Sequence, residues 1–132
     1  MQPTDQIVSR VPEHIVANAR PLGTSNGGRA CDYNVAAWLL VPGMAQLPVT
    51  LLASYGDGER QHEVVIDHGT LNASGRILLS GIARLPYRYR IDNLQIRLRS
   101  AVGLSRLTVE ELFVQAVEQI ASDQRINAGQ LS

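Results

Sequence analysis

Residues 85–100, LPYRYRIDNLQIRLRS, hold the densest group of ligand-recognising side chains in the sequence. In an extended strand, neighbouring side chains point to opposite faces, so alternate residues share a surface. The apolar positions change phase at Asp92-Asn93, which predicts a β-bulge or a strand break at this point. Residues from both halves would then line one polar surface: Arg88, Arg90, Gln95, Arg97 and Arg99.

Three interpretations of this polar surface compete. It is a solvated sheet face if Gln95 and Arg97 lie opposite Thr108 and Glu110 across the 101–105 turn. It is a ligand groove if the arginines bind acidic sugars, because a guanidinium binds a carboxylate with two parallel hydrogen bonds. It is an interface with a protein partner or a second copy of the chain if arginine and tyrosine serve as anchors.

Two other motifs imitate known sites but lack essential residues. GTSNGGRA (23–30) has the glycine spacing of a phosphate-binding loop, but Arg29 and Ala30 replace the required lysine and hydroxyl, so we expect a flexible loop. HEVVIDH (62–68) resembles a zinc-protease motif but has Ile66 in place of the second histidine. As a buried strand it would place His62 and His68 about 20 Å apart, too far to share an ion.

Candidate nucleophiles and acid–base groups give little support for catalysis. Cys31 is the single cysteine, and we expect an ordinary semi-buried thiol beside the glycine-rich loop. Four carboxylates surround the hairpin turn that Asp57-Gly58 predicts, and we expect them to be solvating residues: Asp57, Glu59, Glu63 and Asp67. We therefore predict no enzymatic activity, no metal site and no cofactor.

Composition narrows the classes of partner. The 132 residues are 45% hydrophobic and 18% charged, as in a single globular domain. The twelve basic residues, all arginine, are balanced by twelve acidic ones, and the 5% aromatic content is low. We therefore expect no nucleic-acid partner. No run of about 20 apolar residues occurs, so we expect no membrane partner. We expect a cytoplasmic protein if this is the whole chain, and an extracellular one if it is a domain of a longer secreted protein.

Turn signals recur about every ten residues and separate short segments rich in valine, isoleucine and leucine, a pattern typical of β-sandwiches. The segments predicted as strands are 33–41, 48–55, 62–68, 76–85 and 87–100. Residues 7–19 would add one or two edge strands, with Pro12 kept out of a central position. We expect a single domain over 1–122 and a flexible tail over 123–132.

Five consecutive segments carry a resemblance to a known family: YNVAAW (33–38), PVTLLASYGDGE (48–59), LLSGIARLP (78–86), YRIDNLQIRLRS (89–100) and LTVEELFV (107–114). Their order over residues 33–114 resembles the carbohydrate-binding modules of xylanases, which have the galactose-binding-like jelly-roll fold. The resemblance implies an antiparallel β-sandwich without catalytic activity that recognises a glycan on its concave sheet. In some relatives the acidic pair near the end helps to hold calcium, but Glu110 and Glu111 alone are too few ligands.

The resemblance extends the candidate ligand-binding set. Trp38 would reach the same concave sheet as Gln95 and Arg97, although burial of Trp38 in the core is a competing interpretation. Arg76 precedes the L-S-G segment, where the family has an aromatic residue. The full set is Trp38, Arg76, Tyr87, Arg88, Tyr89, Arg90, Gln95, Arg97 and Arg99.

One segment remains ambiguous between strand and helix. The apolar residues of 107–121 fall on one face of a helix, and Thr108 and Glu111 would form its capping box. That interpretation gives an α+β fold with a helix at 108–121. The resemblance favours a strand through Val114, and we prefer the strand.

Overall fold

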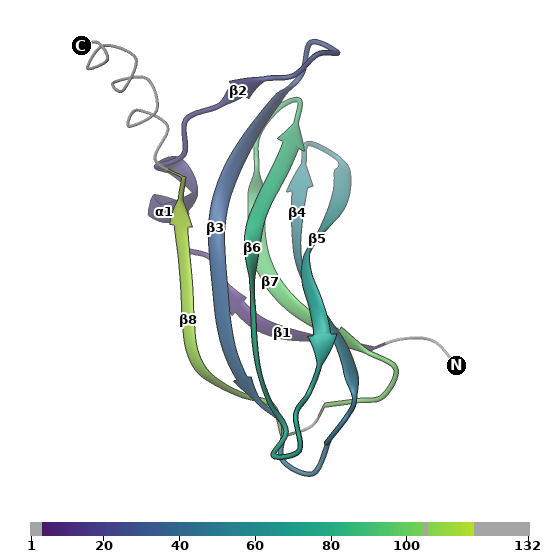
Figure 1. The fold of residues 1–132 in the computed structure, drawn as a ribbon. Coiled ribbons are helices and arrows are strands. Elements are labelled where there is room, and N and C mark those ends of the chain that lie inside the picture. The colour runs from purple at the N-terminus through teal and green to yellow at the C-terminus, as the bar shows by residue number, and fades with distance from the viewer. Residues whose placement is uncertain (1–3, 105, 118–132) are drawn as a thin grey trace, which may run out of the picture.

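The computed structural model describes residues 4–104 and 106–117, which form eight strands and one short helix (Figure 1). The elements are β1 (Thr4–Arg10), α1 (Glu13–Ala17), β2 (Leu22–Gly23), β3 (Arg29–Leu40), β4 (Pro48–Asp57), β5 (Arg60–Thr70), β6 (Arg76–Tyr87), β7 (Asp92–Ser100) and β8 (Thr108–Ala116). The predicted tail, 123–132, lies outside the described residues.

The strands form two antiparallel sheets that pack face to face. Sheet A has the order β1-β7-β4-β5, and in sheet B the central strand β3 pairs with β6 on one side and with β8 and the short β2 on the other. Without β2, this is the order of a jelly roll that lacks its first strand. The predicted all-β, jelly-roll-like sandwich is therefore confirmed.

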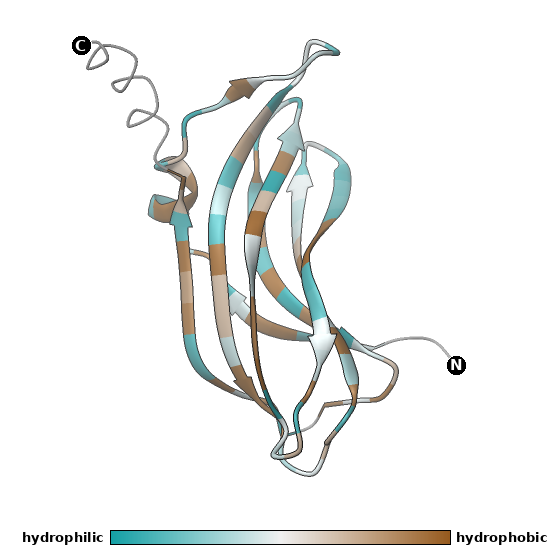
Figure 2. Ribbon diagram, in the orientation of Figure 1, coloured by the Kyte–Doolittle hydropathy of each residue, from teal (hydrophilic) through white to brown (hydrophobic). Residues whose placement is uncertain are grey.

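The core follows from the alternation of side chains along the central strands. On β3, Tyr33, Val35, Ala37 and Leu39 point inward and are at most 3% exposed. Opposite them, β7 contributes Leu94, Ile96 and Leu98 to the same core. Figure 2 shows this alternation as hydrophobic and hydrophilic bands along β3. Burial of these apolar faces drives the two sheets together.

The segment with helical periodicity is a strand, so the alternative of a helix at 108–121 is wrong for its described residues. A bulge in β8 explains the misleading pattern: Trp38 pairs with Glu111, but Leu39 pairs with Val109. The extra residue lets Val109 and Leu112 both pack toward the core although they are three positions apart, as in a helix.

The edges of the sandwich agree with one prediction and correct another. Residues 7–19 contribute to one edge strand, β1, as expected, and then form the short helix α1, with Pro12 as its N-cap. The HEVVIDH strand was expected to be buried, but β5 lies at the edge of sheet A and none of its residues is fully buried.

The two sheets meet closely along the edge formed by β5 and β6. The Asp67 carboxylate accepts a hydrogen bond from the backbone N–H of Ser80 at 3.0 Å. A Cβ atom at Gly81 would lie 2.6 Å from the backbone oxygen of Ile66. Glycine is therefore required where the β6 backbone approaches β5.

Residues 85–100 do not form one strand. They complete β6 in sheet B, turn at residues 88–91 and enter sheet A as β7. The predicted bulge is also present, because Asn93 has a positive φ of 55° and the register with β4 shifts between Ser54 and Gly56. Arginines from the two halves consequently belong to different surfaces.

Replacing Leu39 tests the core assignment. Leu39 is 0% exposed on β3, so Leu39→Ala should lower the free energy of unfolding by about 2–5 kcal/mol. Leu78→Ala is the control. The Leu78 side chain is 43% exposed, so its replacement should lower the free energy of unfolding by less than about 1 kcal/mol. Urea denaturation measures both, and equal losses would contradict the assignment.

Candidate functional site

Gln95, Arg97 and Arg99 lie on the outer face of sheet A, where other protein groups already occupy them. Arg99 binds Asp5 with two hydrogen bonds, of 2.6 and 2.8 Å, and Glu63 with one of 2.8 Å. Arg97 donates to Gln95 at 2.8 and 3.1 Å and to Ser54 at 3.2 Å. This network lies over Leu52, which is only 1% exposed although it points outward.

The partners of this polar face are not those expected from the sequence. β7 lies between β1 and β4 in sheet A, whereas β8 belongs to sheet B, so Thr108 and Glu110 do not face Gln95 or Arg97. Glu110 instead accepts two hydrogen bonds of 3.4 Å from Arg76 at the start of β6.

Electrostatics reinforce the Asp5–Arg99 pair. The hydrogen bond from Arg99 lowers the pKa of Asp5, and partial burial opposes it without reversing the shift. The pKa of Arg99 is raised, first by Asp5 and then by Glu63. Both groups therefore stay ionised at neutral pH, and the network stabilises sheet A.

Trp38 lies on the outer face of sheet B, on the opposite side of the sandwich from Gln95, Arg97 and Arg99. The expected sharing of one sheet by these residues is therefore wrong. The competing interpretation, that Trp38 belongs to the core, is wrong as well, because its side chain is 47% exposed.

Trp38 belongs to an exposed apolar surface. Leu78 is its direct neighbour on β6, and on β8 Phe113 pairs with Ala36, two residues from Trp38 on the same face. Ile82 follows along β6, opposite Asn34. We call this surface the Trp38 face and define it by four side chains with their exposed fractions: Trp38 47%, Leu78 43%, Ile82 59% and Phe113 51%.

Ion pairs flank the Trp38 face at both ends. Arg84 on β6 binds Asp32 on β3 through two hydrogen bonds of 2.8 Å. Arg76, at the other end of β6, pairs with Glu110. The charges at the ends of the face are therefore already paired, whereas the exposed Glu111, directly opposite Trp38 on β8, has no ion-pair partner among the described residues.

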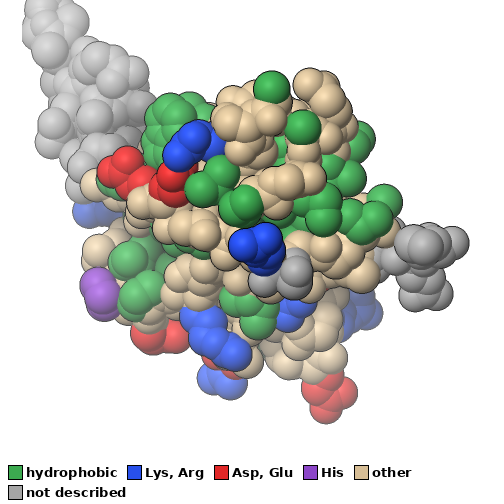
Figure 3. All heavy atoms as spheres, turned by 90° about the horizontal axis from the view of Figure 1, so that it is seen from below, with side chains coloured by type: hydrophobic (Ala, Val, Ile, Leu, Met, Phe, Trp, Pro, Cys, Tyr) green, Lys and Arg blue, Asp and Glu red, His purple; other side chains and the backbone are tan. Residues whose placement is uncertain are grey.

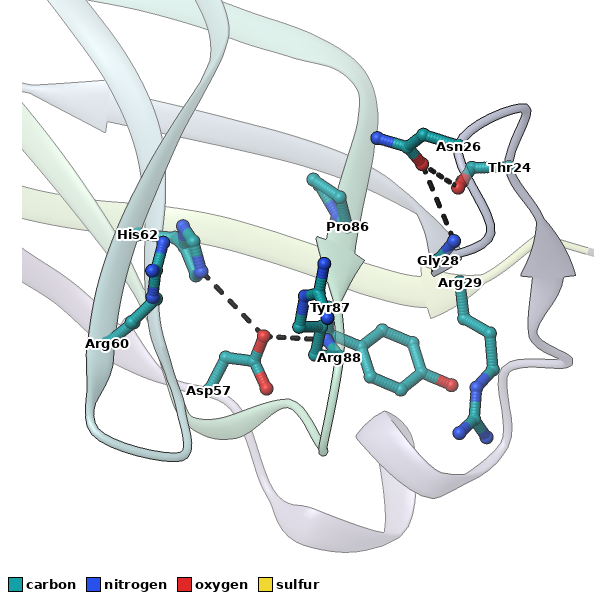
Figure 4. A pocket seen from close by; sticks show the side chains of 10 residues that line it. All are labelled: Thr24, Asn26, Gly28, Arg29, Asp57, Arg60, His62, Pro86, Tyr87 and Arg88. Atoms are coloured by element: carbon teal, nitrogen blue, oxygen red, sulfur yellow. Dashed lines mark hydrogen bonds and ion pairs between the residues drawn. The ribbon is translucent and has the colours of Figure 1, made fainter.

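Three segments converge at the end of the sandwich opposite to the one viewed in Figure 3 and line an open cavity of about 170 Å³ (Figure 4). These segments are the β2–β3 turn, the β4–β5 turn and the end of β6. We call this region the arginine end, because Arg29, Arg60 and Arg88 line the cavity. At the other end of the molecule, basic side chains lie among hydrophobic, acidic and uncharged ones (Figure 3).

Asp57 organises the arginine end. Its carboxylate accepts hydrogen bonds from three successive backbone N–H groups, those of Arg88 (2.7 Å), Tyr89 (2.8 Å) and Arg90 (3.1 Å). The residue is 4% exposed, so its expected role as a solvating residue is wrong. The Asp-Gly hairpin turn is confirmed, with Gly58 at a positive φ of 63°.

The ionised form of Asp57 is favoured. Burial raises the pKa of Asp57, but the N–H groups of Arg88, Tyr89 and Arg90, together with the nearby His62, outweigh burial and lower it overall. The Nε2 atom of His62 lies 3.8 Å from the Asp57 carboxylate. A negative charge is thus fixed beneath the backbone that carries Arg88.

The remaining predicted site residues are divided around this end. Tyr87 and Arg88 line the cavity, while Arg90 pairs with Asp92 at 3.5 Å. Tyr89 is 72% exposed, but its ring packs closely against Gly58. A Cβ atom at position 58 would lie 2.9 Å from the Cδ2 atom of Tyr89. Sequence reasoning missed Arg29 and Arg60, which no local spacing connects to Arg88.

The candidate nucleophile is poorly placed for chemistry. Cys31 is 5% exposed, and burial raises the pKa of its thiol despite the nearby Tyr87 and Tyr33. Within residues 4–104 and 106–117, no three histidine, cysteine or acidic side chains are grouped to hold a metal ion. No helix in that part of the chain has the length and apolar character needed to cross a membrane.

No family model matches the chain, and neither a curated protein nor a solved structure was found to be similar to it. The resemblance to carbohydrate-binding modules therefore stays a prediction.

Acid titration tests the role of Asp57. Because the pKa of Asp57 is lowered in the folded protein, its carboxylate stabilises the fold above the ordinary aspartate pKa of about 4. This contribution is lost as the pH falls through the lowered value. Asp57→Asn should therefore reduce the melting temperature at pH 7, and the difference from wild type should narrow at about pH 3.

Glu59→Gln, in the same turn but exposed, is the control and should leave the melting temperature unchanged. A deficit in Asp57→Asn that is the same at both pH values would contradict the stabilising role of the ionised carboxylate.

Proposed function

We propose that the protein is a non-catalytic binding domain that docks onto another protein through the Trp38 face. The observation that carries this proposal is that four large exposed hydrophobic side chains lie on the same outer face of sheet B. Scattered apolar residues are normal on protein surfaces, whereas contiguous ones mark interaction sites.

The arrangement of charges supports the same proposal. Interfaces have an apolar centre depleted of charge and a polar rim. The Trp38 face has this anatomy, with Asp32–Arg84 at one end and Arg76–Glu110 at the other. These end charges need no partner, but Glu111 beside Trp38 has no ion pair among the described residues, so a docking protein would have to present a cation to it.

The outer face of sheet A offers a useful contrast. There the polar network covers Leu52, and the two exposed apolar side chains, Ile7 and Val65, are separated from each other by Arg97 and Leu52. Removal of apolar area from water provides about 25 cal/mol per Å². The gain from association therefore lies mainly on sheet B.

Glycan binding is the second candidate function. Trp38 and Phe113 both expose aromatic rings on one sheet, and aromatic rings stack on the faces of sugars. The aliphatic side chains of Leu78 and Ile82 favour a protein partner, because they provide neither a planar ring nor a hydrogen bond.

Ile82→Lys tests the docking surface. Val65→Lys is a matched control, since Val65 has the same exposed fraction of 59% but belongs to sheet A. Proteins that co-purify with the wild-type domain should be retained by Val65→Lys, and Ile82→Lys should weaken their affinity at least about tenfold. Equal retention by both variants would contradict the proposal.

Fluorescence distinguishes the kinds of partner, because Trp38 is the single tryptophan. Its emission should shift to shorter wavelength when a partner covers the ring. A shift that reverses on dilution, together with a dimeric mass in light scattering, identifies a second copy as the partner. Retention on a glycan affinity gel that is lost in Trp38→Ala, but unchanged in Ile82→Lys, would instead identify a sugar.

A further inference from the structure

We propose that the arginine end binds a small ligand through an oxyanion group, a carboxylate or a phosphate. This site is separate from the Trp38 face and does not depend on the proposed docking function. Guanidinium groups only donate hydrogen bonds, and their fork matches both kinds of oxyanion.

The arginines of this end are available to a ligand. Among the described residues, no carboxylate lies within 4.0 Å of the guanidinium nitrogens of Arg29, Arg60 or Arg88. Elsewhere the arginines with ion-pair partners are Arg76, Arg84, Arg90, Arg97 and Arg99. Arg10, Arg20 and Arg106 also have no ion pair among the described residues, but Arg29, Arg60 and Arg88 are distinguished by lining one cavity.

The single carboxylate that lines the cavity cannot neutralise these cations. Asp57 is buried and uses both oxygens to accept the backbone N–H groups of residues 88–90. The lining residues include three arginines and one acid, so they carry a net charge of +2 with His62 neutral. A negatively charged ligand is therefore favoured.

Two adjoining cavities indicate where the ligand would bind. The first has a volume of about 170 Å³ and the second about 210 Å³. The residues common to both are Asn26, Gly28, Arg29, Tyr87 and Arg88. An anion placed here contacts the β2–β3 turn on one side and Arg88 on the other.

Side chains around this position are partly preorganised. The Arg29 guanidinium carbon lies 5.7 Å from the centre of the Tyr87 ring, which restricts the arginine by a cation–π contact. The side-chain oxygen of Asn26 accepts hydrogen bonds from Thr24 Oγ1 at 2.6 Å and Gly28 N at 3.4 Å. Its amide N–H₂ group is left to donate to a ligand oxygen.

Calorimetric titration of the whole chain at low ionic strength tests the site, with inorganic phosphate, galacturonate and galactose as probes. At least one of the two anions should bind, and galactose should not. Phosphate binding identifies a phosphate site, and galacturonate binding identifies a site for acidic sugars. Affinity should fall with added salt, because the arginines are exposed.

Arg29→Gln and Arg88→Gln should each weaken anion binding about tenfold, equivalent to about 1.4 kcal/mol. Arg106→Gln removes an exposed arginine of the β7–β8 loop, at the opposite end, and should leave the affinity unchanged. Ile82→Lys should also leave it unchanged, which separates this site from the Trp38 face.

Three outcomes would overturn the proposal: no binding of either anion, equal binding of galactose, or unchanged affinity in Arg29→Gln and Arg88→Gln. Both arginines are exposed, so these variants should fold normally, and an unchanged melting temperature verifies this.

Discussion

The Asp57 carboxylate fixes the point at which the chain passes from one sheet to the other. Residues 88–90 leave sheet B before β7 begins, so their N–H groups have no ladder partner, and Asp57 accepts all three. The buried hydroxyl of Tyr55, two residues earlier on β4, donates to the carbonyl of Pro86 at 2.6 Å. The end of β4 thereby positions Tyr87 and Arg88, and the geometry of the arginine end depends on it.

The outer faces of the two sheets differ in the side chains that they expose to water. On sheet A, Arg97 and Arg99 form hydrogen bonds with neighbouring strands and cover the apolar atoms between them. On sheet B, the ion pairs lie at the ends of the face, and the centre is left apolar around Trp38. The two faces therefore differ in composition, with hydrogen-bonded arginines along sheet A and four exposed large apolar side chains on sheet B.

Local alternation predicted the apolar face of β7 and the discontinuity at Asp92-Asn93, because the strand period depends only on neighbouring residues. It did not predict that the two halves of 85–100 enter different sheets. Alternation along a strand tells which face a side chain lies on, but not which sheet the strand joins. The bulge at residues 110–111 imitated helical spacing. The burial of Asp57 depends on N–H groups about thirty residues away, and Arg29 and Arg60 reach Arg88 only through the tertiary fold.

The close contact between β5 and β6 has a consequence for solubility. Strands at sheet edges expose unpaired backbone groups that can recruit strands from other molecules. Here the approach of Gly81 to Ile66, together with the hydrogen bond from Ser80 to Asp67, turns the edges of β5 and β6 toward each other. A larger residue at Gly81 would separate these edges and expose both to intermolecular pairing. Substitution of this glycine is therefore expected to promote aggregation as well as to disturb the packing of the two sheets.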